Sequence, residues 1–147
     1  MIAVIQRCSR GKVMVSEKVV GKIDNGLVIL LGVQKGDTEK DANFLVNKIS
    51  GLRIFSDEND KMNLSIKDVN GSALIISQFT LCGDTKKGRR PSFIKAATPD
   101  DGNKLYEYFM SEMKKDGVPI ESGEFGAMMD VALVNNGPVT FVLNSKD

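Results

Sequence analysis

The polar groups best placed for chemistry lie in one segment, Ser77-Gln78-Phe79-Thr80-Leu81. The segment directly follows the apolar run 73–76, and α/β proteins bind ligands in the crevice at the carboxyl ends of their strands. Two hydroxyls and an amide side chain could orient a substrate there, and backbone N–H groups at the strand end could stabilise an oxyanion. The alternative is that the strand reaches its solvated end, with Ser77 and Thr80 satisfying nearby backbone groups.

The sequence contains no histidine and only two cysteines, Cys8 and Cys82, which lie far apart. This composition excludes Ser-His-Asp and Cys-His catalysis, histidine-based proton transfer, and zinc sites built from histidine or paired thiolates. A nucleophilic Ser77 or Thr80 would need an activating base, and the sequence has no histidine to act as that base. We expect both cysteines to be buried, reduced thiols.

A second candidate segment is Asn135-Asn136-Gly137-Pro138-Val139-Thr140. A Gly-Pro pair can present bare backbone carbonyls to a ligand, because glycine allows another group to approach the backbone closely. The alternative is a plain turn between two strands. The sequence does not distinguish a cis from a trans Gly137-Pro138 bond.

A third candidate is the basic loop that holds Lys86, Lys87, Arg89 and Arg90. These cations could contact RNA phosphates. The alternative is a solvated surface loop. Phe93 is the one aromatic residue close by, so the sequence gives little indication of base stacking.

Apolar periodicity predicts the elements that position these segments. Thr38 caps a first helix with Asp41 at the capping-box position, and Thr98 caps a second helix with Pro99 at its first position. A purely parallel sheet would need a crossover helix for every pair of strands, and here the strands outnumber the helices. We therefore predict one α/β domain, 1–147, with some antiparallel neighbours. The second helix is predicted to have an apolar stripe of Leu105, Tyr108, Phe109 and Met113. Turns are expected at Gly11 and at 135–138. The expected strands are 1–8, 12–17, 19–23, 27–33, 52–55, 73–76, 128–134 and 139–143.

The bulk composition is that of an ordinary globular domain. The chain has 147 residues, of which 41% are hydrophobic and 27% charged, and its formal net charge of +1 points to no particular partner. The apolar run at the N-terminus is too short for a signal peptide or a membrane span, so we expect a soluble cytoplasmic protein.

These segments resemble a known family, the D-aminoacyl-tRNA deacylases (the D-tyrosyl-tRNA deacylase family). Segment 77–81 matches the family's SQFTL motif, and segment 135–140 matches its NxGPVT motif. Residues 3–7, 88–93 and 125–127 are also similar to the family, so the resemblance spans essentially the whole chain.

The resemblance implies a single three-layer α/β domain with mixed or antiparallel sheets and two main helices. It also implies a homodimer with the active site at the interface. Gly137 and Pro138, joined by a cis bond, would reach from one subunit into the pocket of the other, where their carbonyls would hold the amino group and Cα of the substrate. An L side chain would then clash with this backbone, whereas a D side chain would point to solvent and glycine would also fit. The catalytic pocket would be formed by Ser77, Gln78, Phe79 and Thr80.

The resemblance also assigns substrate binding to Arg7, Phe125 and Ala127, with Arg7 fixing the Gly-Pro motif. It explains the missing histidine, because the terminal ribose of tRNA would contribute its 2′-hydroxyl while backbone amides near Gln78 and Phe79 form an oxyanion hole. A nucleophilic Thr80 is less favoured, for want of a base. The implied partner is the aminoacylated 3′ end of tRNA, with no metal, cofactor, DNA or membrane.

Two other classes of function stay open at this point. One is a non-catalytic RNA-binding module with the same fold, and the other is a hydrolase of another small ester or amide. Turnover distinguishes the first from the deacylase, and dependence on the tRNA 2′-hydroxyl distinguishes the second.

Overall fold

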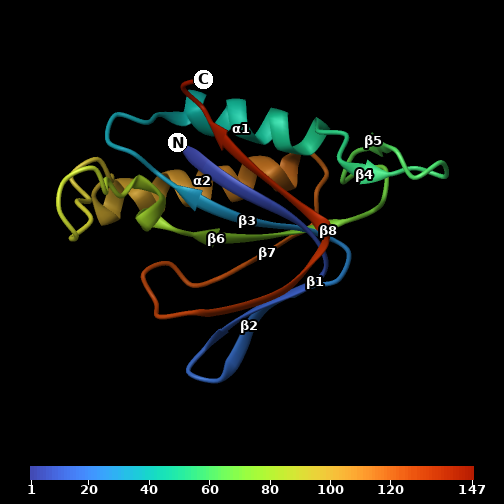
Figure 1. Ribbon diagram of the computed structural model, residues 1–147, viewed down its shortest axis with the longest axis horizontal. Coiled ribbons are helices and arrows are strands. Elements are labelled where there is room, and N and C mark those ends of the chain that lie inside the picture. The colour runs from blue at the N-terminus through green and yellow to red at the C-terminus, as the bar shows by residue number, and fades with distance from the viewer.

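The computed structural model describes residues 1–147 and is built on a mixed six-stranded sheet (Figure 1). The strand order is β2-β1-β3-β6-β7, and β8 pairs with the other edge of β1 along most of its length. Strand β3 is antiparallel to β1 but parallel to β6, which is parallel to β7. The strands are β1 (Ile2–Val15), β2 (Lys18–Ile23), β3 (Gly26–Gly32), β6 (Ser72–Ser77), β7 (Ile120–Ser122) and β8 (Asp130–Asn144), with a separate hairpin of β4 (Phe55–Ser56) and β5 (Met62–Leu64).

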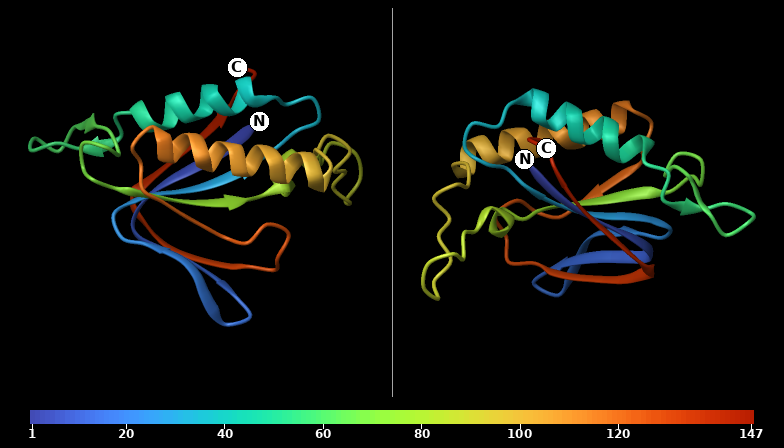
Figure 2. Two further views of the ribbon diagram at one scale, coloured as in Figure 1. Left: turned by 180° about the vertical axis from the view of Figure 1, so that it is seen from behind. Right: turned by 45° about the horizontal axis from the view of Figure 1, so that its top comes forward.

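Two helices, α1 (Glu39–Gly51) and α2 (Pro99–Lys115), lie side by side on one face of the sheet (Figures 1 and 2). They cover the main apolar core, in which Ile29, Ile75 and Phe109 are fully buried. The predicted α/β class, with two helices and a mixed sheet, is therefore confirmed. Every helix of the protein is too short or too polar to cross a membrane.

Both helices begin where their capping residues predict. The Thr38 hydroxyl accepts a hydrogen bond from the Lys40 N–H at 3.3 Å, and the Asp41 carboxylate accepts one from the Thr38 N–H at 2.8 Å. At α2 the Thr98 hydroxyl accepts from the Asp101 N–H at 3.3 Å. Leu105 and Tyr108 of the predicted stripe are half-buried and pack against the core, whereas Phe109 and Met113 are fully buried, and Tyr106, which was not predicted, is buried as well.

The largest correction concerns β1 and β8, each of which was predicted as two strands separated by a turn. Each is one continuous strand, and no turn forms at Gly11 or at 135–138. The β1–β8 ladder instead shifts register between Gln6 and Cys8 and again between Cys8 and Arg10. Such irregularities bend a strand without ending it.

The far ends of these strands form a curled arm, which consists of residues 10–15 of β1, all of β2 and residues 130–134 of β8. The arm extends from the sheet on the side away from the helices (Figures 1 and 2). Its inner residues Val13 and Ile23 pack on Val28, Leu74 and Ile76 to form a second apolar cluster. The free thiol of Cys8 is buried in this cluster, and Cys82 is also buried and free, as expected for both.

The smallest elements escaped prediction. The strand expected at 52–55 is reduced to β4, and neither β5 nor β7 was predicted. A short 3₁₀ helix, η1 (Phe79–Cys82), follows β6 and was also missed. Elements of two to four residues are too short to show a hydrophobic period.

The C-terminal tail is fastened to the start of α1 through Asp41. The Asp41 carboxylate accepts a hydrogen bond from the Ser145 hydroxyl at 2.7 Å and lies 2.8 Å from the Lys146 ammonium. Burial by itself raises the pKa of the Asp41 carboxyl group. The hydrogen bonds that it accepts from Lys146, Thr38 and Ser145, together with the positive charge of Lys146, outweigh this effect and hold the pKa well below its ordinary range.

We expect Asp41→Asn to lower the free energy of unfolding at pH 7 by about 1–2 kcal/mol, since one partner is solvent-exposed. A carboxylate with a depressed folded pKa stabilises the fold above its unfolded pKa of about 3.9, and this contribution is lost as pH falls through the folded pKa. The difference between variant and wild type should therefore shrink below about pH 4, as measured by urea unfolding at pH 7 and pH 3. The exposed Asp147→Asn is the control, and a difference independent of pH would contradict the assignment.

Candidate functional site

Residues 77–79 form one wall of a pocket of about 660 Å³ at the carboxyl end of β6. Ser77 is the last residue of β6, Gln78 follows it, and Phe79 begins η1. The opposite wall is the loop between β7 and β8, and the start of α2 closes one side. The lining includes Ser77, Gln78, Phe79, Pro99, Gly102, Phe125, Gly126, Ala127 and Met128. The structure therefore brings together five predicted site residues, Ser77, Gln78, Phe79, Phe125 and Ala127.

Thr80 lies outside the lining of this pocket. Its hydroxyl accepts a hydrogen bond from the side-chain amide of Gln78. Neither Thr80 nor Ser77 is hydrogen-bonded to a carboxylate or an amine that could take its proton. The geometry therefore supplies no activated hydroxyl nucleophile.

The backbone amides at this strand end differ in availability. The Gln78 N–H donates to the Leu31 carbonyl at 2.8 Å, so it is not free to stabilise an oxyanion, and our expectation was wrong for this amide. The Phe79 and Thr80 N–H groups stand at the start of η1, where the first donors of a helix have no acceptor within it. These two amides are the ones that could meet developing negative charge.

Tyr106 connects β6 to the loop that holds Phe125 and was not predicted as a site residue. Its hydroxyl donates to the Ile75 carbonyl at 2.7 Å, two residues before Ser77, and its ring lies 5.9 Å from the Phe125 ring. Burial raises the pKa of Tyr106 to about 12, so the hydroxyl keeps its proton and remains a donor. Its signal in the sequence was helical spacing, because Tyr106, Phe109 and Met113 share one face of α2.

Gly137 and Pro138 lie in the middle of β8, exposed and joined by a cis peptide bond. Buried Arg7 holds the backbone next to them, since its Nε donates to the Asn136 carbonyl at 3.1 Å while Nη1 donates to the Ile54 carbonyl at 2.8 Å. None of Arg7, Gly137 and Pro138 lines the pocket of their own chain. The structure thus pairs Arg7 with the Gly-Pro segment but keeps both apart from Ser77.

Comparison with known proteins decides the family. A family model described as D-Tyr-tRNA(Tyr) deacylase matches residues 4–144. The chain belongs to this family. It is 55% identical to the D-aminoacyl-tRNA deacylase of Thermotoga petrophila, over 99% of this chain and 97% of that protein. It is 53% identical to the D-aminoacyl-tRNA deacylase of Bacillus cereus strain G9842, over 99% of this chain and all of that protein.

Two solved structures agree with this membership. One, titled c-Myc DNA Unwinding Element Binding Protein, is 37% identical with a TM-score of 0.93 and 98% coverage of both chains. The other, titled a probable eukaryotic D-amino acid tRNA deacylase, has a TM-score of 0.82 over 97% of this chain and 98% of that chain, and at 18% identity it shows the fold alone. Membership of the deacylase family confirms the predicted enzyme class, a hydrolase that acts on aminoacyl-tRNA, and makes tRNA the substrate.

The basic loop of this enzyme stands at the rim of the pocket. The Phe79 ring, exposed at the pocket, packs edge-to-face on Phe93 with centroids 5.0 Å apart. Backbone hydrogen bonds between Asp84 and Ser92, at 2.8 and 2.9 Å, close the loop. The side chains of Lys86, Lys87, Arg89 and Arg90 are exposed and form no ion pair.

Proposed function

We propose that the enzyme hydrolyses the ester between a D-amino acid, or glycine, and the 3′ end of tRNA, in a site that a second copy of the chain completes. The observation that carries this proposal is the position of Ser77, Gln78 and Phe79 on the wall of a pocket, in a member of the deacylase family, with no side chain nearby to activate a nucleophile. The whole chain, 1–147, acts as one deacylase domain, and it works in the cytoplasm.

The protein's part in the reaction is orientation and charge stabilisation. Water adds to the ester carbonyl, the bond from that carbon to the ribose oxygen breaks, and amino acid and tRNA leave. The Phe79 and Thr80 N–H groups stabilise the oxyanion, and one such donor is worth about 3–4 kcal/mol of barrier. Ser77 and Gln78 orient the substrate, while Phe125 and Ala127 bind it on the opposite wall. The 2′-hydroxyl of the terminal ribose takes part in the proton transfer for which the pocket has no side chain.

A second copy of the chain supplies the chiral filter. Gly137 and Pro138 are exposed on β8 and do not reach their own pocket, so they are available to the pocket of a partner. Exposed apolar side chains support an interface, since Met128 at the pocket is 91% exposed and Val142 on β8 is 71% exposed. The Gly-Pro backbone then excludes L side chains and accepts glycine, and Arg7 positions it.

The loop that holds Lys86, Lys87, Arg89 and Arg90 contacts the tRNA end from the rim of the pocket. Binding of nucleic acid without turnover is the second candidate function. It is favoured by the 37% identical structure, whose title names a DNA unwinding element. Turnover separates the two candidates.

Hydrolysis of matched D- and L-tyrosyl-tRNA, with EDTA present, tests the proposed function. Rapid loss of the D ester with the L ester spared is the expected result. Loss of both esters would support hydrolase activity but contradict the role of the Gly-Pro segment as a chiral filter. Loss of neither, from a folded dimer verified by analytical ultracentrifugation, would favour the binding function.

Thr80→Val is expected to lower kcat/KM for D-tyrosyl-tRNA by less than about tenfold, because it removes one hydrogen bond to Gln78 and keeps the backbone amide. Rapid quenching and intact-mass spectrometry should show no aminoacyl-enzyme in either protein. Thr80→Ser, which keeps the hydroxyl, is the matched control. A loss beyond a thousandfold in Thr80→Val, or a trapped ester on Thr80, would restore the nucleophilic role.

A further inference from the structure

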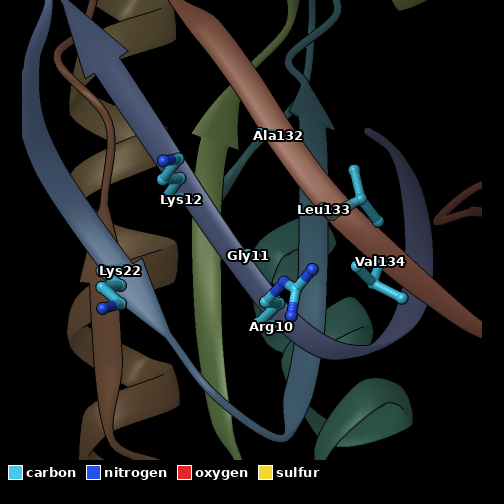
Figure 3. A pocket seen from close by; sticks show the side chains of 7 residues that line it. All are labelled: Arg10, Gly11, Lys12, Lys22, Ala132, Leu133 and Val134. Atoms are coloured by element: carbon cyan, nitrogen blue, oxygen red, sulfur yellow. The ribbon is translucent and has the colours of Figure 1, made fainter.

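A basic groove lies on the arm, where β1 runs between β2 and β8 (Figure 3). It has a volume of about 440 Å³, and its lining includes Arg10, Lys12, Lys22, Ala132 and Val134. The three cations come from β1 and β2, and three apolar residues, Ala132, Leu133 and Val134, come from β8 (Figure 3). We call this feature the arm groove.

The strand register places these cations together. Lys12 lies directly opposite Lys22 in the β1–β2 ladder, and Arg10 is two residues away on the same face. Like charges directly opposite each other destabilise a sheet. Glu121 accepts a hydrogen bond from the backbone N–H of Lys22 at 3.3 Å, yet none of the three cations forms an ion pair with a carboxylate. Their charge is therefore available to an anion from outside.

The space between the cations is open because the neighbouring residue is small. Ala132 of β8 lies directly opposite Lys12 on its other side, and Val134 lies opposite Arg10. Three cations spaced along an open groove fit a chain of phosphates better than a single carboxylate, since phosphates repeat along a nucleic acid.

The arm groove is next to the catalytic pocket through β8. Val131 lines the pocket, and the next three residues of β8, Ala132, Leu133 and Val134, line the groove. The far edge of β8 pairs with no strand, so a polymer leaving the pocket can pass over it. Gly137 is three residues beyond Val134, about 10 Å along the strand.

We propose that the arm groove binds backbone phosphates of the tRNA strand that carries the amino acid, upstream of its terminal adenosine. The identity of this ligand rests on the proposed function, whereas the anionic character of the ligand rests on the three cations alone. The arm groove is separate from the basic loop, which stands beside Phe79 at the other wall of the pocket.

The test compares Arg10→Gln/Lys12→Gln/Lys22→Gln with Lys40→Gln/Lys61→Gln/Lys114→Gln, which removes the same charge from exposed, unpaired lysines on the helices and the β4–β5 hairpin. Two substrates are used, D-tyrosyl-tRNA and D-tyrosyl-adenosine, which lacks every upstream phosphate. The loop variant Lys86→Gln/Lys87→Gln/Arg89→Gln/Arg90→Gln, measured in parallel, separates the two basic surfaces.

For the groove variant we expect kcat/KM on D-tyrosyl-tRNA to fall at least tenfold at low salt, while the rate on D-tyrosyl-adenosine stays the same. The slope of log affinity for uncharged tRNA against log salt should flatten by about 0.7–0.9 for each phosphate that the variant no longer neutralises. Stability should be unchanged or higher, since a like-charge pair is removed. The control variant should change neither rate nor slope by a comparable amount.

Three outcomes would overturn the proposal. They are an equal loss on both substrates, an unchanged salt slope, and competition by blunt duplex DNA as strong as that by tRNA, which would make the groove a general polyanion surface. Failure of the proposed function is recognised separately, because the wild type would then spare both D substrates while the tRNA-binding measurement still reports on the groove.

Discussion

Replacing Gly137 by alanine is expected to lower kcat/KM for D-tyrosyl-tRNA by at least about 100-fold, the loss that a displacement of about 1 Å at a positioned group can cause. Gly137 has a φ of +129°, a conformation that residues with a side chain rarely adopt. A Cβ there would lie 2.7 Å from Cγ2 of Val139 and 3.0 Å from Nη2 of Arg7. The alanine variant must therefore move the backbone that we propose as the chiral filter.

The measurement is single-turnover deacylation of D- and L-tyrosyl-tRNA, with dimerisation and the thermal unfolding midpoint checked alongside. The neighbouring Asn136→Ala is the matched control, because Asn136 is exposed and its backbone carbonyl, which Arg7 binds, remains. We expect that control to keep its rate within a few-fold. A Gly137→Ala protein that dimerises normally and deacylates the D substrate at full rate would refute the filter.

Glycines show where local sequence signals mislead in this fold. Gly11 indicates a turn between two strands, yet β1 continues through it. A Cβ on Gly11 would lie 2.9 Å from Cγ2 of Val28, so this glycine allows the arm to pack closely on β3. The Asn-Asn-Gly-Pro sequence at 135–138 is likewise a turn signal that β8 overrides. In both places pairing with strands distant in the sequence decides the conformation, and a local pattern does not contain that information.

The parts that could be predicted are those fixed by neighbours in sequence. Capping residues Thr38 and Thr98 set the helix starts, and the continuous apolar run at 27–33 indicated the central strand. The walls of the pocket were found through motifs, but their support was not, because Tyr106 joins Ile75 to Phe125 across three elements. The arm groove was also missed, since Lys12 and Lys22 come together only through the β1–β2 register.

Arg7→Lys should have an effect comparable to that of Gly137→Ala, although Arg7 is buried and lies outside the pocket of its own chain. Its guanidinium joins two carbonyls, those of Ile54 and Asn136, and Asn136 is 129 residues away in the sequence. An ammonium is a compact point charge and cannot make both bonds in the geometry of the planar fork. We expect kcat/KM for the D ester to fall by about 100-fold and the ratio of D to L rates to fall with it, because the guanidinium no longer fixes the Gly-Pro backbone.

A structural role alone would not change the D-to-L ratio, which is why the ratio is the decisive readout. Arg53→Lys is the matched control, since the Nε of Arg53 donates to the Asn63 carbonyl at 2.9 Å in the exposed β4–β5 region, and it should leave the ratio unchanged.

Arg7→Met adds a second test. Arg7 is only 9% exposed and faces carbonyls without a carboxylate, so removing its charge relieves a desolvation cost while leaving two carbonyls unpaired. If Arg7→Met folds with near-normal stability, yet both its kcat/KM for the D ester and its ratio of D to L rates fall, the guanidinium is retained for positioning. If Arg7→Lys keeps both, Arg7 does not hold the filter.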